Sequence, residues 1–148
     1  MDECGIETYL YREYGYAARG QKVYSRVSDC KYKRCGIVAA QMNGKVLAPL
    51  QYDGTMDRSL FEFWFSNQLL PALDKGCMVV LGNASFHCKS RLFSAAQKAG
   101  ITLLFLPPYS PELNPIEHFW VWLKRQLRSI LHASLPFDAA LFDVFQLC

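Results

Sequence analysis

The first half of the chain alternates polar and apolar positions in short runs, as β-strands do. Residues 35–41 and 45–52 are rich in apolar and β-branched side chains, and they flank Asn43-Gly44, the dipeptide most typical of a two-residue hairpin turn. This pattern predicts two antiparallel strands over residues 35–52. The runs Glu7 to Tyr11, where alternation is weak, and Gln21 to Ser28 predict further strands before them.

The hydrophobic period changes after residue 55. Apolar residues recur at steps of three and four from Leu60 to Leu73, which predicts a helix capped by Thr55 or Asp57 and ended by Lys75-Gly76. Continuous apolar runs at 77–81 and 101–106 predict buried strands. The pattern also predicts a helix over 90–99, a last helix from about Pro115 to Leu131, and a short apolar segment at 139–147.

The order of these elements predicts the fold class. A hairpin followed by alternating strands and helices indicates an α/β domain with a mixed sheet and helices on both faces. Right-handed crossovers would bring Asp2, Leu81 and Leu106, at the ends of three strands, beside one another. Ligands of open α/β sheets bind off the carboxyl ends of strands. The order fits an RNase H-like fold, and it also fits other α/β domains.

Composition agrees with a folded domain. The chain has 148 residues, of which 51% are hydrophobic and 20% charged, so it can bury a core and wholesale disorder is excluded. No apolar run approaches the roughly 20 residues that a membrane helix needs. Asp2 and Glu3 directly follow Met1, so we expect no signal peptide, and we expect a cytoplasmic, nucleoid-associated protein. Six cysteines without a CxxC pair indicate reduced thiols rather than a zinc site or disulfides.

Positive charge is concentrated in one segment. The net charge is only +3, but the segment from Arg12 to Arg34 holds seven basic and two acidic residues, with four tyrosines among them and Tyr11 directly before it. Such a segment suits a phosphate backbone and unstacked bases, or it is the solvated face of a sheet. Basic residues of the last helix have the same two interpretations. The candidate nucleic-acid contacts are Arg19, Lys22, Arg26, Lys31, Lys33, Arg34, Lys124, Arg125 and Arg128.

Polar residues suited to chemistry occur at three places. Asp2-Glu3 lies before or within a first strand, the segment from Gly82 to His87 follows a buried strand, and the proline-rich run from Pro107 to Trp120 follows the next strand and enters the last helix. These places, with the Arg19-Gly20-Gln21 turn, resemble the DDE-superfamily transposases, specifically the mariner-like group and its bacterial insertion-sequence relatives. The resemblance extends from about Asp2 to Leu131, and its most specific part is the proline-rich run.

The resemblance implies a set of metal ligands. In such enzymes three carboxylates hold two Mg²⁺ ions, or Mn²⁺, about 3.5–4 Å apart, because hard cations require oxygen ligands during displacement at phosphorus. Asp2 and Glu117 would be the first and third ligands. The second position falls on Gly82, since 34 residues lie between Gly82 and Glu117, which is the spacing of this group. Glycine offers no side-chain ligand, so we expect the paired-metal site and catalysis to be impaired.

Three further residues have supporting roles by the same resemblance: Asn83, His87 and Asn114. His87 either orders the loop at the active site or is a core or capping histidine. For Asn114 we expect hydrogen bonds to backbone in the proline-rich loop. Trp120 is expected in the core rather than as a platform for a base.

The functional prediction is a DNA transposase catalytic domain that cleaves DNA and transfers strands. It would act on double-stranded DNA, both transposon ends and target, as a homodimer, without a membrane or a small-molecule cofactor. The alternatives are a non-catalytic DNA-binding or dimerising transposase remnant, and a nuclease for RNA–DNA hybrids, which the proline-rich motif disfavours. We expect a catalytic domain over residues 1–131, with a truncated first strand and no helix-turn-helix module, and a short C-terminal tail over 132–148 that can be helical.

Overall fold

The structure is a computed structural model that describes residues 1–7, 16–22, 24, 34–130 and 136–147. Its first sheet is antiparallel, in the order β1 (Asp2–Glu7), β2 (Arg34–Met42), β3 (Lys45–Asp53). The β2–β3 hairpin turns at Asn43 and Gly44, whose φ angles are 52° and 79°. Two successive positive φ values are those of a type I′ turn, so the predicted hairpin is confirmed together with its turn chemistry.

The second sheet is parallel. Strands β4 (Met78–Leu81) and β5 (Thr102–Phe105) pair along their whole length, and helix α2 (Lys89–Ala99) makes the crossover between them. Gly100 ends α2 with a φ of 74°, a left-handed conformation that glycine adopts without strain. All three elements were predicted, and no predicted boundary differs from the observed one by more than one residue.

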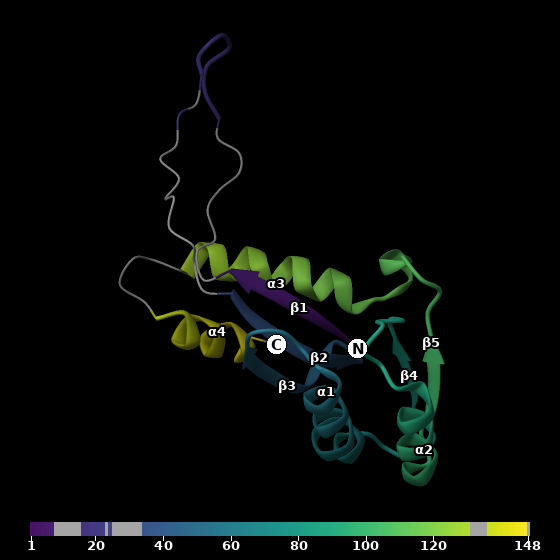
Figure 1. Ribbon diagram of the computed structural model, residues 1–148. Helices are drawn as coiled ribbons and strands as arrows, with labels where there is room; N and C mark the ends of the chain where they lie inside the picture. The colour runs from purple at the N-terminus through teal and green to yellow at the C-terminus, as the bar shows by residue number, and fades with distance from the viewer. Residues whose placement is uncertain (8–15, 23, 25–33, 131–135, 148) are drawn as a thin grey trace.

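The two sheets meet at Met1, which lies between β1 and β4 (Figure 1). The Met1 amino group donates a hydrogen bond of 2.9 Å to the Val80 carbonyl oxygen, whereas the β1–β2 ladder begins with Asp2 opposite Ala39. The structure thus has an antiparallel sheet and a parallel sheet where we expected a single mixed sheet. This hydrogen bond links the two sheets, and Val38 and Ala40 of β2 share a core with Val79 and Leu81 of β4.

Helices cover both faces of the antiparallel sheet, as predicted (Figure 1). On one face, α3 (Ile116–Ile130) and α4 (Phe137–Phe145) enclose a core with Cys4 and Ile6 of β1 and Ile37 and Ala39 of β2. On the other face, the alternate residues Val38 and Ala40 pack against the helical segment that starts at Arg58. Trp120 is 2% exposed and belongs to the α3 core, which confirms its predicted place.

The helix predicted to reach Leu73 changes type along its length. It begins as α1 (Arg58–Trp64), continues as a π-helical turn, η1 (Phe65–Leu69), and ends as a 3₁₀ turn, η2 (Leu70–Ala72). Asp57 caps it, since its Oδ1 accepts a hydrogen bond of 2.8 Å from the Leu60 amide. The amide of Leu70 bonds to Phe65, five residues back, and Pro71 has no amide hydrogen, so the α-helical pattern cannot continue.

One early strand prediction falls mostly outside the described residues, and another was wrong. The first strand is β1, Asp2–Glu7, and residues 8–11 of the predicted run lie outside the described part of the chain. Of the predicted strand at 21–28, Gln21, Lys22 and Tyr24 are described, and they are exposed and not in a strand. Because all three side chains are exposed, the alternation here places none of them on a buried face. Packing of such a face is what favours strand formation. No described helix has both the length and the apolar character that crossing a membrane requires.

The cap of α1 gives a stability prediction. Replacing Asp57 by alanine removes the carboxylate that satisfies the Leu60 amide, so we expect the free energy of unfolding to fall by about 1 kcal/mol. Thermal denaturation followed by circular dichroism should show a decrease in Tm of roughly 2–4 °C. Asp74→Ala is the matched control, because Asp74 is an exposed carboxylate beyond the end of the same helical segment. Equal effects of the two substitutions would contradict the capping role.

Candidate active site

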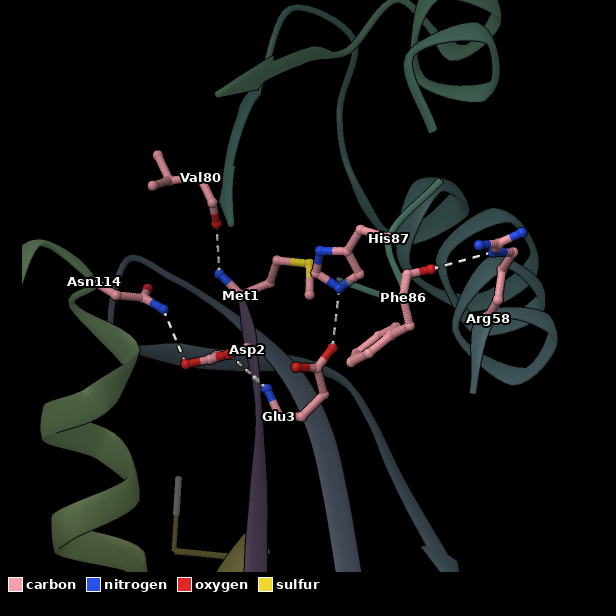
Figure 2. Close-up of polar contacts among 8 residues, drawn as sticks. All are labelled: Met1, Asp2, Glu3, Arg58, Val80, Phe86, His87 and Asn114. Carbon is pink, nitrogen blue, oxygen red and sulfur yellow. Dashed lines mark hydrogen bonds and ion pairs between the residues drawn. The ribbon is translucent and has the colours of Figure 1, made fainter. Parts of the chain in front are cut away.

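Asp2 points from the start of β1 toward the segment that enters α3 (Figure 2). Its Oδ2 accepts a hydrogen bond of 3.2 Å from Asn114 Nδ2, and its Oδ1 accepts one of 2.9 Å from the Glu3 backbone amide. Asn114 is therefore a partner of a side chain, and not of backbone alone as the sequence led us to expect. Residues 2 and 114 come from opposite ends of the chain, and the fold makes them neighbours.

Glu117 lies in the first turn of α3 and completes a pair of acids with Asp2. The two carboxyl groups are hydrogen-bonded to each other. Partial burial raises the pKa of both groups above their ordinary values, and for Glu117 the bond to Asp2 raises the pKa further. Lys124, two helical turns further along α3, opposes this increase at Glu117. The pair therefore holds less negative charge than two isolated carboxylates would.

Gly82 faces the same acid pair. A Cβ built on Gly82 would lie 3.9 Å from Asp2 Oδ1, with no other atom within 4 Å outside its chain neighbours. Gly82 is not among the residues with positive φ, so its backbone conformation is open to any side chain. Positions 2 and 82 thus lie close together, as the predicted strand ends required, and Glu117, which the family resemblance added to this set, contacts Asp2.

Glu3 points to the opposite face of β1, away from Asp2 (Figure 2). Its Oε1 lies 3.4 Å from His87 Nε2, and the His87 ring packs against Phe61 with 4.2 Å between centroids and an angle of 31° between the ring planes. His87 is 8% exposed, and the neighbouring Phe86 carbonyl accepts a 3.4 Å hydrogen bond from Arg58. These contacts tie the loop after β4 to β1 and α1, so His87 both is buried and anchors the loop that carries Gly82.

Some of these contacts were missed in the sequence. Glu3 received no role of its own there, although the alternation of side chains along a strand requires Asp2 and Glu3 to face opposite sides. Phe61 was predicted only as part of an apolar helix face. Of the supporting residues, Asn114 reaches Asp2, while Asn83 is exposed and no contact within the described part of the chain joins it to the acid pair.

The candidate basic residues do not gather at one place. Lys124 is half-buried, close to Glu117 and Cys4, while Arg125 and Arg128 are exposed on α3. Arg34 extends over Gly5 on the face of the sheet opposite Asp2. Arg19 and Lys22 are exposed, and Arg26, Lys31 and Lys33 lie outside the described residues.

The side chains at the acid pair offer oxygen atoms as possible metal ligands. Carboxylates of Asp2 and Glu117 and the amide of Asn114 suit a hard divalent cation. Among the described residues, no group of three or more His, Cys, Asp or Glu side chains is arranged for a metal, because position 82 is glycine. Cys4 and Cys35 are buried and Cys77 and Cys88 half-buried, and none of these four forms a disulfide.

The acid pair gives a prediction for stability against pH. An acid whose pKa is raised on folding destabilises the fold at pH above that pKa, and the destabilisation disappears as the pH falls through it. Glu117→Gln removes one acid of the pair, so we expect a higher Tm at neutral pH. The effect should stay below about 1 kcal/mol, roughly 3 °C, since the side chain is partly exposed.

Thermal denaturation at several pH values tests this expectation. The difference between Glu117→Gln and the unaltered chain should shrink as the pH falls from 7 toward 4.5, the ordinary value for a glutamate. Glu112→Gln is the control, because Glu112 is an exposed carboxylate in the proline-rich segment just before α3. A Tm that falls at neutral pH in Glu117→Gln would contradict the raised pKa.

Comparisons with known proteins agree with this geometry. A family model described as DDE superfamily endonuclease matches residues 1–137. The Tcb1 transposase of Caenorhabditis briggsae is 32% identical over 81 residues, covering 52% of this chain and 30% of that protein. The Tcb2 transposase of the same species is 30% identical over 111 residues, covering 70% of this chain and 40% of that protein.

Solved structures are similar as well. The Mos1 transposase in its strand transfer complex superposes with a TM-score of 0.68 at 16% identity, over 99% of this chain and 50% of that one. The chain thus spans less than half the length of the two curated relatives and half that of the Mos1 protein. With the family model covering nearly the whole chain, this protein belongs to the DDE superfamily of endonucleases.

Proposed function

We propose that this chain is the catalytic part of a DNA transposase, in which Asp2 and Glu117 bind a divalent metal ion. The observation that supports this most directly is the contact of these two carboxyl groups at the point faced by position 82. Such a pair suits Mg²⁺ or Mn²⁺, because these ions take one or two carboxylates together with water and phosphate oxygens. When bound, the ion would activate the attacking oxygen and stabilise the leaving oxygen of a DNA phosphodiester.

The finer fold that we propose is RNase H-like. In that arrangement β1 and β4 lie side by side, and the hydrogen bond from Met1 to Val80 supports this order. Asp2 then stands at the centre of the molecule, between the strand that carries Gly82 and the helix that carries Glu117. The predicted domain limit at residue 131 remains part of the proposal, and α4 beyond it packs against α3.

We infer that Gly82 impairs catalysis, because one of three anionic oxygen ligands is missing. A site for two ions with only two carboxylates leaves more positive charge uncompensated, so the second ion should bind weakly. The space beside Gly82 supports restoration by aspartate, since a new Cβ would make only ordinary van der Waals contact with Asp2 Oδ1 at 3.9 Å.

The substrate that we propose is double-stranded DNA, with transposon ends and target bound by a homodimer. Support comes from the strand transfer complex of the Mos1 relative and from the exposed basic residues on α3, Arg125 and Arg128. A protein that cuts genomic DNA works where that DNA lies, which in a bacterial cell is the cytoplasm, at the nucleoid.

Restoring the carboxylate tests the enzymatic proposal. Gly82→Asp should raise Mg²⁺-dependent nicking of supercoiled plasmid DNA by at least about a hundredfold, since a missing metal ligand typically costs more than the 10–100-fold of an outer-shell partner. Gly82→Asn is the matched control, because asparagine fills the same space without the charge. Full nicking by the unaltered chain would show that Gly82 is no impairment, and no gain in Gly82→Asp would contradict the site.

The absence of a carboxylate at position 82 also favours a second candidate, a transposase remnant that binds DNA or dimerises without cutting it. Both candidates predict DNA binding. Only the first predicts nicking after Gly82→Asp, so the same assay separates them.

DNA binding has its own test. The double variant Arg125→Ala/Arg128→Ala should weaken binding to duplex DNA and reduce the slope of log affinity against log salt by about 2, one for each phosphate that these guanidinium groups neutralise. Fluorescence anisotropy at several salt concentrations measures the slope. Lys98→Ala on α2 is the control for removal of an exposed cation. An unchanged slope in the double variant would exclude this face of α3 from the DNA interface.

A further inference from the structure

The side chain of Asn114 is buried beside the acid pair, and one of its two polar atoms has no partner in the described part of the chain. It is 4% exposed, its Nδ2 donates to Asp2 Oδ2 at 3.2 Å, and its Oδ1 is buried without a hydrogen-bond partner in the described part of the chain. An acceptor left in this state destabilises the fold, because it has lost its water without gaining another partner. The protein thus has a buried amide oxygen without a hydrogen-bond donor among the described residues, on a side chain that contacts the acid pair.

Rotation of the Asn114 amide by half a turn exchanges its nitrogen and its oxygen. Oδ1 would then stand where Nδ2 stands now, 3.2 Å from Asp2 Oδ2. Two acceptor oxygens repel each other at this distance unless a cation or a proton lies between them. Adjacent oxygens on an octahedral Mg²⁺ ion, with bonds of about 2.1 Å, are roughly 3.0 Å apart. The separation therefore matches two neighbouring ligands of one ion.

The backbone holds Asn114 ready for this role. It follows the 3₁₀ turn η3 (Pro111–Leu113), where its amide donates to the Pro111 carbonyl at 2.9 Å, and its own carbonyl accepts from the Glu117 amide at 3.1 Å. The same short segment thus fixes both Asn114 and Glu117. A ligand that is positioned before the ion arrives loses little conformational entropy on binding.

We propose that the Asn114 side-chain oxygen is a third protein ligand for a divalent cation held by Asp2 and Glu117, where Gly82 supplies none. The inference rests on the proposed function, and it makes this chain a binder of one cation. Two carboxylates and one neutral amide carry enough charge for a single Mg²⁺ or Mn²⁺, since such ions usually take only one or two carboxylates from a protein. Lys124, the cation close to Glu117, lies two helical turns away along α3.

The test counts the water molecules on a bound ion. Tb³⁺ is added to the folded chain, and its luminescence lifetime in H₂O and D₂O gives the number of coordinated waters. Asn114→Ala should raise that number by about one, because water replaces the missing oxygen, and Mn²⁺ affinity followed by electron paramagnetic resonance should fall at least about tenfold. Asn114→Leu should give the same result while it preserves the buried volume.

Two further variants keep the outcomes distinct. Asn67→Ala, at an exposed asparagine of η1, should change neither the water number nor the affinity. The double variant Asp2→Asn/Glu117→Gln should abolish binding. If it does so while Asn114→Ala and Asn114→Leu leave the water number unchanged, Asn114 is no ligand and this inference is overturned, although the carboxylate site stands. If the double variant binds Tb³⁺ as the unaltered chain does, the proposed function loses its metal site as well.

Discussion

The candidate site depends on keeping two carboxyl groups in contact. Asp2 and Glu117 are partly withdrawn from water and hydrogen-bonded to each other, although two negative charges at this distance repel. The energy that opposes their approach must be offset by the rest of the fold, and the two apolar cores on either side of β1 and β2 provide it. A site that destabilises its own protein is the usual mark of a group arranged for binding and not for stability.

Much of this arrangement was accessible from the sequence, because local signals agreed with the global topology. Asn43-Gly44 predicted the hairpin, Gly100 the end of α2, and the apolar runs the two parallel strands. The handedness of crossovers predicted that Asp2 would lie beside the ends of the strands at Leu81 and Leu106. The choice of Gly82 and Glu117 as site positions came from the resemblance to the DDE superfamily, and not from the strand order.

The parts that were not predicted have physical causes of another kind. The π-helical turn at Phe65–Leu69 depends on where a proline interrupts the hydrogen bonds, a local competition that periodicity does not reveal. The two sheets are separate although the Met1 amino group, just before the β1–β2 ladder begins at Asp2, bonds to Val80 of β4. Side-chain patterns do not reveal where such backbone pairing stops. The unsatisfied oxygen of Asn114 is a property of packing in three dimensions, since the same asparagine in an open loop would be hydrated. For the same reason the partnership of Glu3 with His87 emerged only from the three-dimensional structure.

Adjacent residues of β1 serve opposite sides of the molecule, Asp2 toward α3 and Glu3 toward His87. A slip of one residue in the pairing of β1 with β2 would exchange them, bringing the longer glutamate side chain to the side that faces α3 and leaving the histidine facing a shorter one. The register of this six-residue strand therefore decides which acid, and so which side-chain length, faces α3 in the site. It matters as much as the identity of the residue. Selection on such a chain would act on strand alignment even where every functional side chain stayed the same.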